Sequence, residues 1–139
     1  MSLHSLMRMD GEAMVTMKQV NGTREDIERA RQLYRLQAEL CQTLADPTRL
    51  ELLQLLGDGP KAVKELVEAT GQRQAKISQH LAIMRRRGIV TAERAGVEMR
   101  YSLTDRRIID ACRITRDMLI DQLARQGALA ALLAEGEES

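Results

Sequence analysis

The sequence predicts a mainly helical fold with one small β-hairpin, on the basis of three observations. Apolar residues recur at helical spacing through successive segments, and Gly or Pro separates these segments. The one stretch rich in β-branched and aromatic residues, 89–103, is divided by a Gly-containing turn, as in a hairpin. With 139 residues, 44% of them hydrophobic and 29% charged, the chain suits one globular domain with its own core.

Composition divides the chain into an arm, a domain and an extension. Residues 1–22 hold five of the eight methionines, show no sustained period and end in Asn21-Gly22, so we expect a flexible N-terminal arm. Residues 23–126 should form the folded domain, and residues 127–139 a C-terminal extension. Within that extension, 128–134 could continue the preceding helix, and 135–139 reads as a polar tail.

Two helices are expected before the central part of the domain. Thr23 followed by Asp26 is typical of a helix start, and this helix should run to about Ala45. Its apolar arc is wider than one surface helix needs, so we expect it to pack on two partners, one of which could be another subunit. Asp46 and Pro47 then form an N-cap followed by Pro at the first helical position, which predicts a short helix ending at Gly57.

The next two helices have the order of a helix-turn-helix unit. Val63, Leu66 and Val67 mark a helix that ends near Gly71. The following segment, 72–88, repeats apolar residues at spacings of four and three, which leaves a polar edge free to enter a groove of DNA. Residues 72–100 carry a net charge of +5, whereas the whole chain has a net charge of +1. Negative charge in the rest of the chain therefore offsets this basic segment.

The hairpin and a final helix complete the prediction of a winged helix-turn-helix. Strands are expected at 89–94 and 98–103, where Arg94 and Arg100 could meet the phosphate backbone. Thr104 or Asp105 can then cap a long helix that runs to about Gln126.

Several classes of protein are not expected. The sequence has no run of 18 apolar residues and no segment like a secretory signal, so we expect a cytoplasmic protein that does not enter membranes. It has no phosphate-binding glycine loop, no HExxH and no set of nucleophile, base and orienting residue, so we expect neither an enzyme nor a cofactor. Phe and Trp are absent, which argues against base stacking on single-stranded nucleic acid.

Three segments together resemble the ArsR/SmtB family of winged-helix repressors, which leave operator DNA when a metal ion or another chemical signal binds or modifies them. The resemblance covers roughly residues 25–124, and its segments are Leu44-Ala45-Asp46-Pro47-Thr48-Arg49-Leu50-Glu51-Leu52-Leu53, Gln74-Ala75-Lys76-Ile77-Ser78-Gln79-His80-Leu81 and Arg94-Ala95-Gly96-Val97-Glu98-Met99-Arg100-Tyr101-Ser102-Leu103. It implies a homodimer formed by the first and last helices and recognition of double-stranded operator DNA. A dimer would read two half-sites about 34 Å apart.

The resemblance and the charge pattern together select the DNA-binding candidates. Gln can bond bidentately to adenine, Lys and Ser reach guanine or phosphate, and His80 could either read a base or brace its helix. The candidates are Arg73, Gln74, Lys76, Ser78, Gln79, His80, Arg85, Arg94 and Arg100.

The metal-sensing positions of the resembled family are changed in this chain. Ala62 and Lys64 stand where arsenic-responsive members carry a Cys-x-Cys pair, so that site is missing. Where other members use carboxylates and imidazoles on the last helix, this chain has Asp105, Arg107, Met118 and Asp121, without either imidazole. Zinc binds poorly without nitrogen or sulfur ligands, so we expect no metal site there.

Two cysteines remain as a candidate sensor. Cys41 on the first helix and Cys112 on the last are 71 residues apart, and either they are buried structural thiols or folding brings them together. As a pair they would form a dithiol switch that responds to oxidation, to a persulfide bridge or to a thiophilic metalloid. The alternative for the whole chain is a winged-helix module for protein assembly, which should show no specific binding of duplex DNA and no steep salt dependence.

Overall fold

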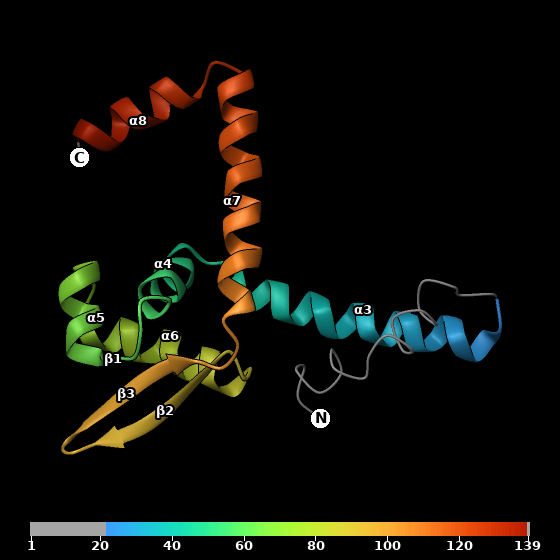
Figure 1. The fold of residues 1–139 in the computed structure, drawn as a ribbon, viewed down its shortest axis with the longest axis horizontal. Helices are drawn as coiled ribbons and strands as arrows, with labels where there is room; N and C mark the ends of the chain where they lie inside the picture. Colours follow the sequence, from blue (N-terminus) through green and yellow to red (C-terminus); the bar gives the residue numbers. More distant parts are fainter. Residues whose placement is uncertain (1–21, 139) are drawn as a thin grey trace. The chain divides into compact units, whose positions relative to one another are not determined.

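The computed structural model describes residues 22–138 and divides into two compact units, one ending at Asp105 and one beginning at Arg106. The predicted N-terminal arm, apart from Gly22, lies outside the described residues. Figure 1 shows the helices and strands, which are α3 (Arg24–Leu44), α4 (Pro47–Leu56), β1 (Lys61–Ala62), α5 (Val63–Thr70), α6 (Gln74–Arg86), β2 (Val90–Ala95), β3 (Glu98–Leu103), α7 (Arg107–Arg125) and α8 (Leu129–Glu138).

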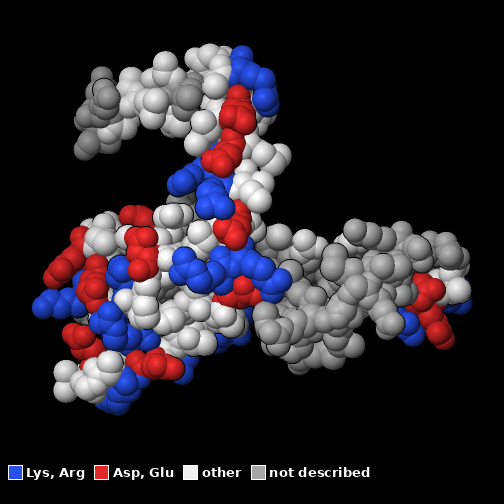
Figure 2. All heavy atoms as spheres, in the orientation of Figure 1, with Lys and Arg blue, Asp and Glu red and all other residues white. Residues whose placement is uncertain are grey.

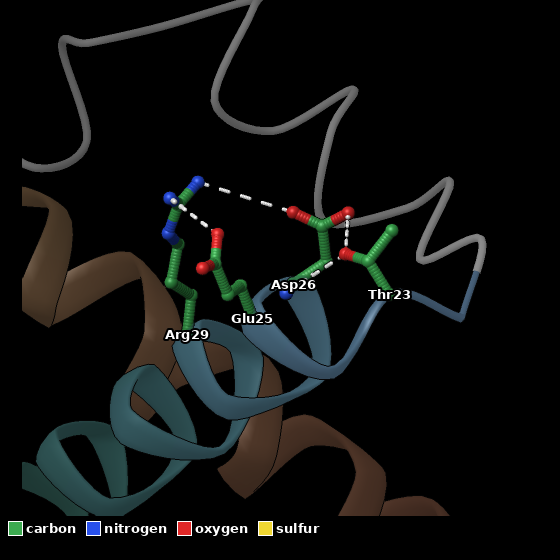
Figure 3. A network of polar contacts seen from close by, with 4 residues as sticks. All are labelled: Thr23, Glu25, Asp26 and Arg29. Carbon is green, nitrogen blue, oxygen red and sulfur yellow. Dashed lines mark hydrogen bonds and ion pairs between the residues drawn. The ribbon is translucent and has the colours of Figure 1, made fainter.

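Helix α3 begins where the sequence predicts, with Thr23 as its N-cap. The Thr23 side chain accepts a hydrogen bond from the Asp26 amide over 3.2 Å and donates one to the Asp26 carboxylate. Figure 3 shows these contacts beside Arg29, whose guanidinium lies 4.0 Å from Glu25 and 3.9 Å from Asp26. Acidic residues in a first turn favour the helix dipole, so the start of α3 is stabilised by its own sequence.

The core of the first unit lies among α4, α5 and α6. Asp46 caps α4 by accepting a hydrogen bond from the Arg49 amide over 3.0 Å, and Pro47 follows it, as predicted. Leu52, Leu53 and Leu56 of α4 and Leu66 of α5 are each at most 2% exposed. These aliphatic side chains are closely packed, so the core against which α6 packs is rigid.

Helix α6 buries the predicted apolar stripe and ends at the predicted glycine. Ile77, Leu81 and Met84 are all 0% exposed. Gly88 has φ +75°, and the Ile89 amide donates to the Met84 carbonyl over 2.9 Å, which is the bond of a Schellman ending. The helix itself spans 74–86, so it is shorter by two residues at each end than the predicted segment.

The hairpin is part of a three-stranded antiparallel sheet of order β1-β3-β2. Strands β2 and β3 pair from Val90 with Leu103 to Ala95 with Glu98, as the sequence predicts. The added strand, β1, pairs Lys61 with Tyr101. A strand of two residues is too short to show any period, which is why the sequence predicted only a hairpin. Fold class is otherwise confirmed, since the described chain is a winged helix-turn-helix with mainly helical content.

The second unit corrects two predictions. Helix α7 begins after Arg106, which makes no side-chain cap, rather than after Thr104 or Asp105. The Ile109 amide donates to the Arg106 carbonyl over 3.0 Å, so a tight turn at Arg106 starts the helix. Gly127, with φ +71°, separates α7 from α8, and α8 extends through most of the predicted polar tail. Ala and Glu favour helices even where no apolar period is present. Within residues 22–138, no helix combines the length and the apolar character that crossing a membrane requires.

The burial pattern of α4 predicts a contrast between two leucines of the same helix. Leu52 is 0% exposed and Leu50 is 44% exposed. Leu52→Ala should lower the free energy of unfolding by about 2–5 kcal/mol, because it removes buried methyl groups and leaves a cavity. Leu50→Ala should cost about 1 kcal/mol or less. Urea denaturation followed by circular dichroism measures both, and equal losses would contradict this description of the core.

Candidate nucleic-acid interface

The outward face of α6 is centred on Gln79. At about 100° of rotation per residue, Gln79 lies nearly opposite the buried stripe of Ile77, Leu81 and Met84. Ala75 and Ala82 share this face and are exposed, so their small side chains let the helix backbone come close to another surface. The other predicted contacts of the first two turns are also exposed, namely Arg73, Gln74, Lys76 and Ser78.

The end of α6 is basic. Arg85 is exposed, as a contact with DNA would require, and Arg86 is exposed on the outward face although the sequence analysis did not select it. Arg87 instead pairs with Glu39 of α3, with its Nη1 3.6 Å from Glu39 Oε2. Cations at a helix C-terminus stabilise the helix dipole, so these arginines favour the helix whatever they bind.

The two arginines of the wing have different surroundings. Arg94 on β2 is exposed. Arg100 on β3 is half-buried: its Nη1 donates to Glu65 Oε1 over 3.1 Å and its Nη2 donates to the Pro60 carbonyl over 2.9 Å. The guanidinium of Arg100 therefore ties the wing to the start of α5, which favours a role in placing the wing rather than in binding phosphate.

Glu65 is the residue that receives this contact, and the sequence analysis did not select it. Its Oε1 also accepts a hydrogen bond from the Ala62 amide over 3.2 Å, and this contact caps the start of α5. That backbone hydrogen bond, followed by the nearby charge and hydrogen bond of Arg100, lowers the pKa of Glu65 below its usual value. The carboxylate thus stays charged and joins α5, β1 and the wing.

His80 points toward the protein rather than toward the outward face. Its side chain is only 14% exposed, and its Nδ1 lies 3.2 Å from Nη1 of Arg49. Its Nε2 lies 3.9 Å from Oδ1 of Asp46. Of the two roles considered for His80, these contacts favour bracing of α6. Arg49 was part of the resemblance, but the sequence analysis assigned it no role, because nothing local shows that it reaches a residue 31 positions away.

Asp46 is held in its charged form by this arrangement. The hydrogen bond from the Arg49 amide is the largest of the effects that lower its pKa below the usual value, and the positive charge of the Arg49 guanidinium adds to it. Partial burial acts in the opposite direction but does not prevail. Asp46 therefore presents a carboxylate both to the start of α4 and to the imidazole of His80.

Charge on the surface of the first unit is mixed. Figure 2 shows both basic and acidic side chains over the wing on the face in view. The wing sequence agrees, since Glu93 and Glu98 stand beside Arg94. Contact with a phosphate backbone would therefore depend on individual exposed arginines and lysines rather than on a uniformly basic face.

The two cysteines lie in different units and in different surroundings. Cys41 on α3 is exposed, whereas Cys112 on α7 is half-buried, and this burial raises the pKa of the Cys112 thiol. Among residues 22–138, no three or more His, Cys, Asp or Glu side chains are grouped as a metal site would need. If Cys41 and Cys112 sense a chemical signal, their thiols would be the groups that react with it.

Comparison with known proteins assigns the family. The family model described as "Bacterial regulatory protein, arsR family" matches residues 46–92. A curated relative from Streptomyces lividans, named "Probable mercury resistance operon repressor", is 37% identical over 101 residues, which are 73% of this chain and 81% of the relative. The chain belongs to the arsR family. Members of this family are DNA-binding regulators of transcription, so the helix-turn-helix and wing described above are parts of a DNA-binding regulator.

Two solved structures match the fold as well. The crystal structure of Rv0081 from Mycobacterium tuberculosis has a TM-score of 0.63 and 36% identity, and the match covers 69% of this chain and 97% of that one. A solution structure from Mycobacterium bovis, described as a homodimeric winged helix-turn-helix DNA-binding domain of a possible ArsR-family regulator, has a TM-score of 0.62 and 26% identity. It covers 68% of this chain and 88% of that one. Each of these two structures therefore matches about two thirds of this chain.

The state of Asp46 leads to a prediction about acid stability. Because the pKa of Asp46 is lowered in the folded protein, its contribution is present above the unfolded value of about 3.9 and is lost as the pH falls through the folded value. Asp46→Asn keeps a capping oxygen but does not titrate, so its free energy of unfolding should fall less steeply below about pH 4 than that of the wild type.

Urea denaturation at a series of pH values measures this difference. The matched variant Asp46→Ala also loses the cap and should cost about 1 kcal/mol at neutral pH. Parallel pH curves for the wild type and Asp46→Asn would show that Asp46 does not contribute in this way.

Proposed function

We propose that this protein is a transcriptional repressor that binds operator DNA as a homodimer and is released by a chemical signal at Cys41 and Cys112. The observation that carries the DNA-binding part is the outward face of α6, where polar and basic side chains are exposed around Gln79 while the opposite stripe is fully buried. A regulator of this kind would act in the cytoplasm, where bacterial DNA lies.

The proposed contacts follow from the chemistry of the exposed side chains. Gln74 and Gln79 carry amides that can bond bidentately to adenine in the major groove. Lys76 and Arg73 can reach guanine or phosphate, and Arg94 on the wing can reach the backbone beside the groove. Ser78 and Arg85 complete the set on the flank of the same helix. Arg100 and His80, which have partners within the protein, are proposed to position these groups instead.

Exposed apolar surface on the long helices supports the homodimer. Helix α7 contains no buried residue, and Ile114 and Met118 are 59% and 66% exposed. On α3, Tyr34 is 62% exposed. Apolar surface of this extent on long helices is typical of a protein–protein interface. The Mycobacterium bovis neighbour is described as homodimeric, which agrees with the proposal that a second copy of this chain covers these helices.

The thiol chemistry of the two cysteines supports the proposed signal. Cys41 is exposed, so oxidants, sulfide species and thiophilic ions can reach it. Soft thiolate ligands favour soft metals, and the relative from Streptomyces lividans carries mercury resistance in its name. An oxidant would take two electrons from the two thiols, which form a disulfide and release two protons. Buried structural thiols remain the alternative for Cys112, which is half-buried.

The DNA-binding proposal predicts how affinity depends on salt. We expect the reduced protein to bind a duplex from upstream of its own coding region more tightly than a scrambled duplex in about 0.15 M salt, with two chains per duplex. Arg94→Ala should reduce the slope of log affinity against log salt by about 0.9 for each lost phosphate contact. Arg100→Ala should change this slope less, because its guanidinium is already engaged by Glu65 and Pro60.

Fluorescence anisotropy measures these affinities, and Arg29→Ala is a matched control, since Arg29 is paired with acidic neighbours at the start of α3. Its slope should equal that of the wild type. Equal binding to the upstream and scrambled duplexes, with no steep slope, would instead favour the winged-helix assembly module.

The thiol proposal predicts a reversible loss of binding. Treatment of the wild type with diamide, polysulfide or Hg(II) should weaken operator binding at least tenfold, and excess dithiothreitol should restore it. Cys41→Ser and Cys112→Ser should bind DNA normally and lose this response. In alkylation by iodoacetamide followed by mass spectrometry, Cys41 should react before Cys112, whose burial and raised pKa reduce the fraction of reactive thiolate. An unchanged response in both variants would rule out this pair as the sensor.

A further inference from the structure

A chain of polar contacts links the end of α3 to the inner flank of α6. Nε of Arg49 donates a hydrogen bond to the Thr43 carbonyl, in the last turn of α3. Nη1 of the same guanidinium lies 3.2 Å from Nδ1 of His80, on α6. Arg49 itself stands in the first turn of α4, so one side chain joins three helices. Thr43 is 5% exposed and the side chain of His80 is 14% exposed, so water competes little for these contacts.

The chemistry of Arg49 determines the state of His80 in this contact. A guanidinium has no acceptor, so Nδ1 of His80 must accept the hydrogen bond with its lone pair. The imidazole is then neutral and carries its proton on Nε2, which faces Oδ1 of Asp46 at 3.9 Å. The charged groups that face the ring are thus Arg49 and Asp46, both at the start of α4. A second proton on His80 would point at the guanidinium and break the contact.

We propose that Arg49 and the neutral imidazole of His80 are positioning residues, which hold α6 at the orientation that operator DNA requires, and that protonation of His80 releases this hold. The inference rests on the proposed DNA-binding function and adds a pH dependence to it. Asp46 still faces the charged ring, 3.9 Å from Nε2, but it is the N-cap of α4 and does not replace the link that runs from α3 through Arg49 to His80.

A second contact supports coupling between the same two helices. Glu39 of α3 pairs with Arg87, which follows the last residue of α6. The last two turns of α3 are therefore linked to the inner flank of α6 through Arg49, and to the residue that follows α6 through Glu39. Cys41 lies between the two anchoring residues Glu39 and Thr43, so a change at Cys41 would act on the segment from which α6 is held.

Protonation has two opposing effects on DNA binding, and one ratio separates them. An added positive charge strengthens binding to any duplex, whereas a misplaced α6 weakens binding to the operator alone. The informative quantity is therefore the affinity for the upstream duplex divided by that for a scrambled duplex. For the wild type, this ratio should fall about two- to tenfold between about pH 7.5 and pH 5.5, because the loss of one hydrogen bond changes an affinity by about that factor.

Three variants test the contact. His80→Gln keeps an acceptor for Arg49 but does not titrate, so at both pH values its ratio should stay near the high value that the wild type shows at about pH 7.5. His80→Leu removes the acceptor, and Arg49→Lys replaces a fork of donors with a single ammonium, so both should show the low ratio at both pH values. His4→Gln, which changes the other histidine, should behave like the wild type. Circular dichroism confirms that each variant is folded.

Two results would overturn the inference. One is a pH-dependent fall in the ratio of His80→Gln that equals the fall in the wild type. The other is a wild-type ratio in both His80→Leu and Arg49→Lys.

The free protein gives a test that does not depend on DNA. Nitrogen-15 chemical shifts of the imidazole, assigned by comparison with His80→Gln, should show protonation at Nε2 only at pH 7.5. A ring protonated at Nδ1, or a charged ring, would refute the contact even if operator binding is confirmed. If the wild type binds no duplex specifically, the proposed function fails, while this measurement still decides the state of His80.

Discussion

Burial of one stripe of α6 is the constraint on which the rest of the DNA-binding unit depends. Ile77, Leu81 and Met84 are completely enclosed by the aliphatic core of the first unit. Because a helix is a rigid cylinder, fixing this stripe also determines which side chains face outward. Gln79 and its neighbours are presented to solvent as a consequence of the core, and a polar residue in the stripe would cost both stability and the direction of the interface.

Hydrophobic burial fixes which face of α6 points inward, but it is not directional, so polar contacts are needed to fix the tilt of the helix. Three of these contacts join elements that are distant in the sequence. Arg49 reaches His80 across 31 positions, Arg100 reaches Glu65 across 35, and Arg100 reaches Pro60 across 40. The contact between Arg49 and His80 holds α6, and the two contacts of Arg100 hold the wing. The two elements proposed to face DNA, α6 and the wing, are therefore each tied to the rest of the first unit by an arginine that has more than one partner.

This division explains what the sequence could and could not predict. The caps at Thr23 and Asp46, the stripe of α6 and its ending at Gly88 were all predictable, because each involves residues within seven positions of one another. Strand β1 was not, since two residues form no period and pair only with a distant strand. The partners of Arg100 and His80 were missed for the same reason. A basic residue in a wing or a recognition helix looks the same in the sequence whether it faces DNA or the protein.

The contacts between α3 and α6 are sufficient in number and strength for regulation. Removing one hydrogen bond costs about 1 kcal/mol, which amounts to about a fivefold change in affinity. Allosteric coupling energies are typically about 1–3 kcal/mol, so no large rearrangement of the fold is required. A displacement of the last turns of α3 by less than a helical turn would break the Thr43, Arg49 and His80 chain. In the proposed mechanism, a signal that acts on α3 therefore reaches the outward face of α6 within the first unit alone.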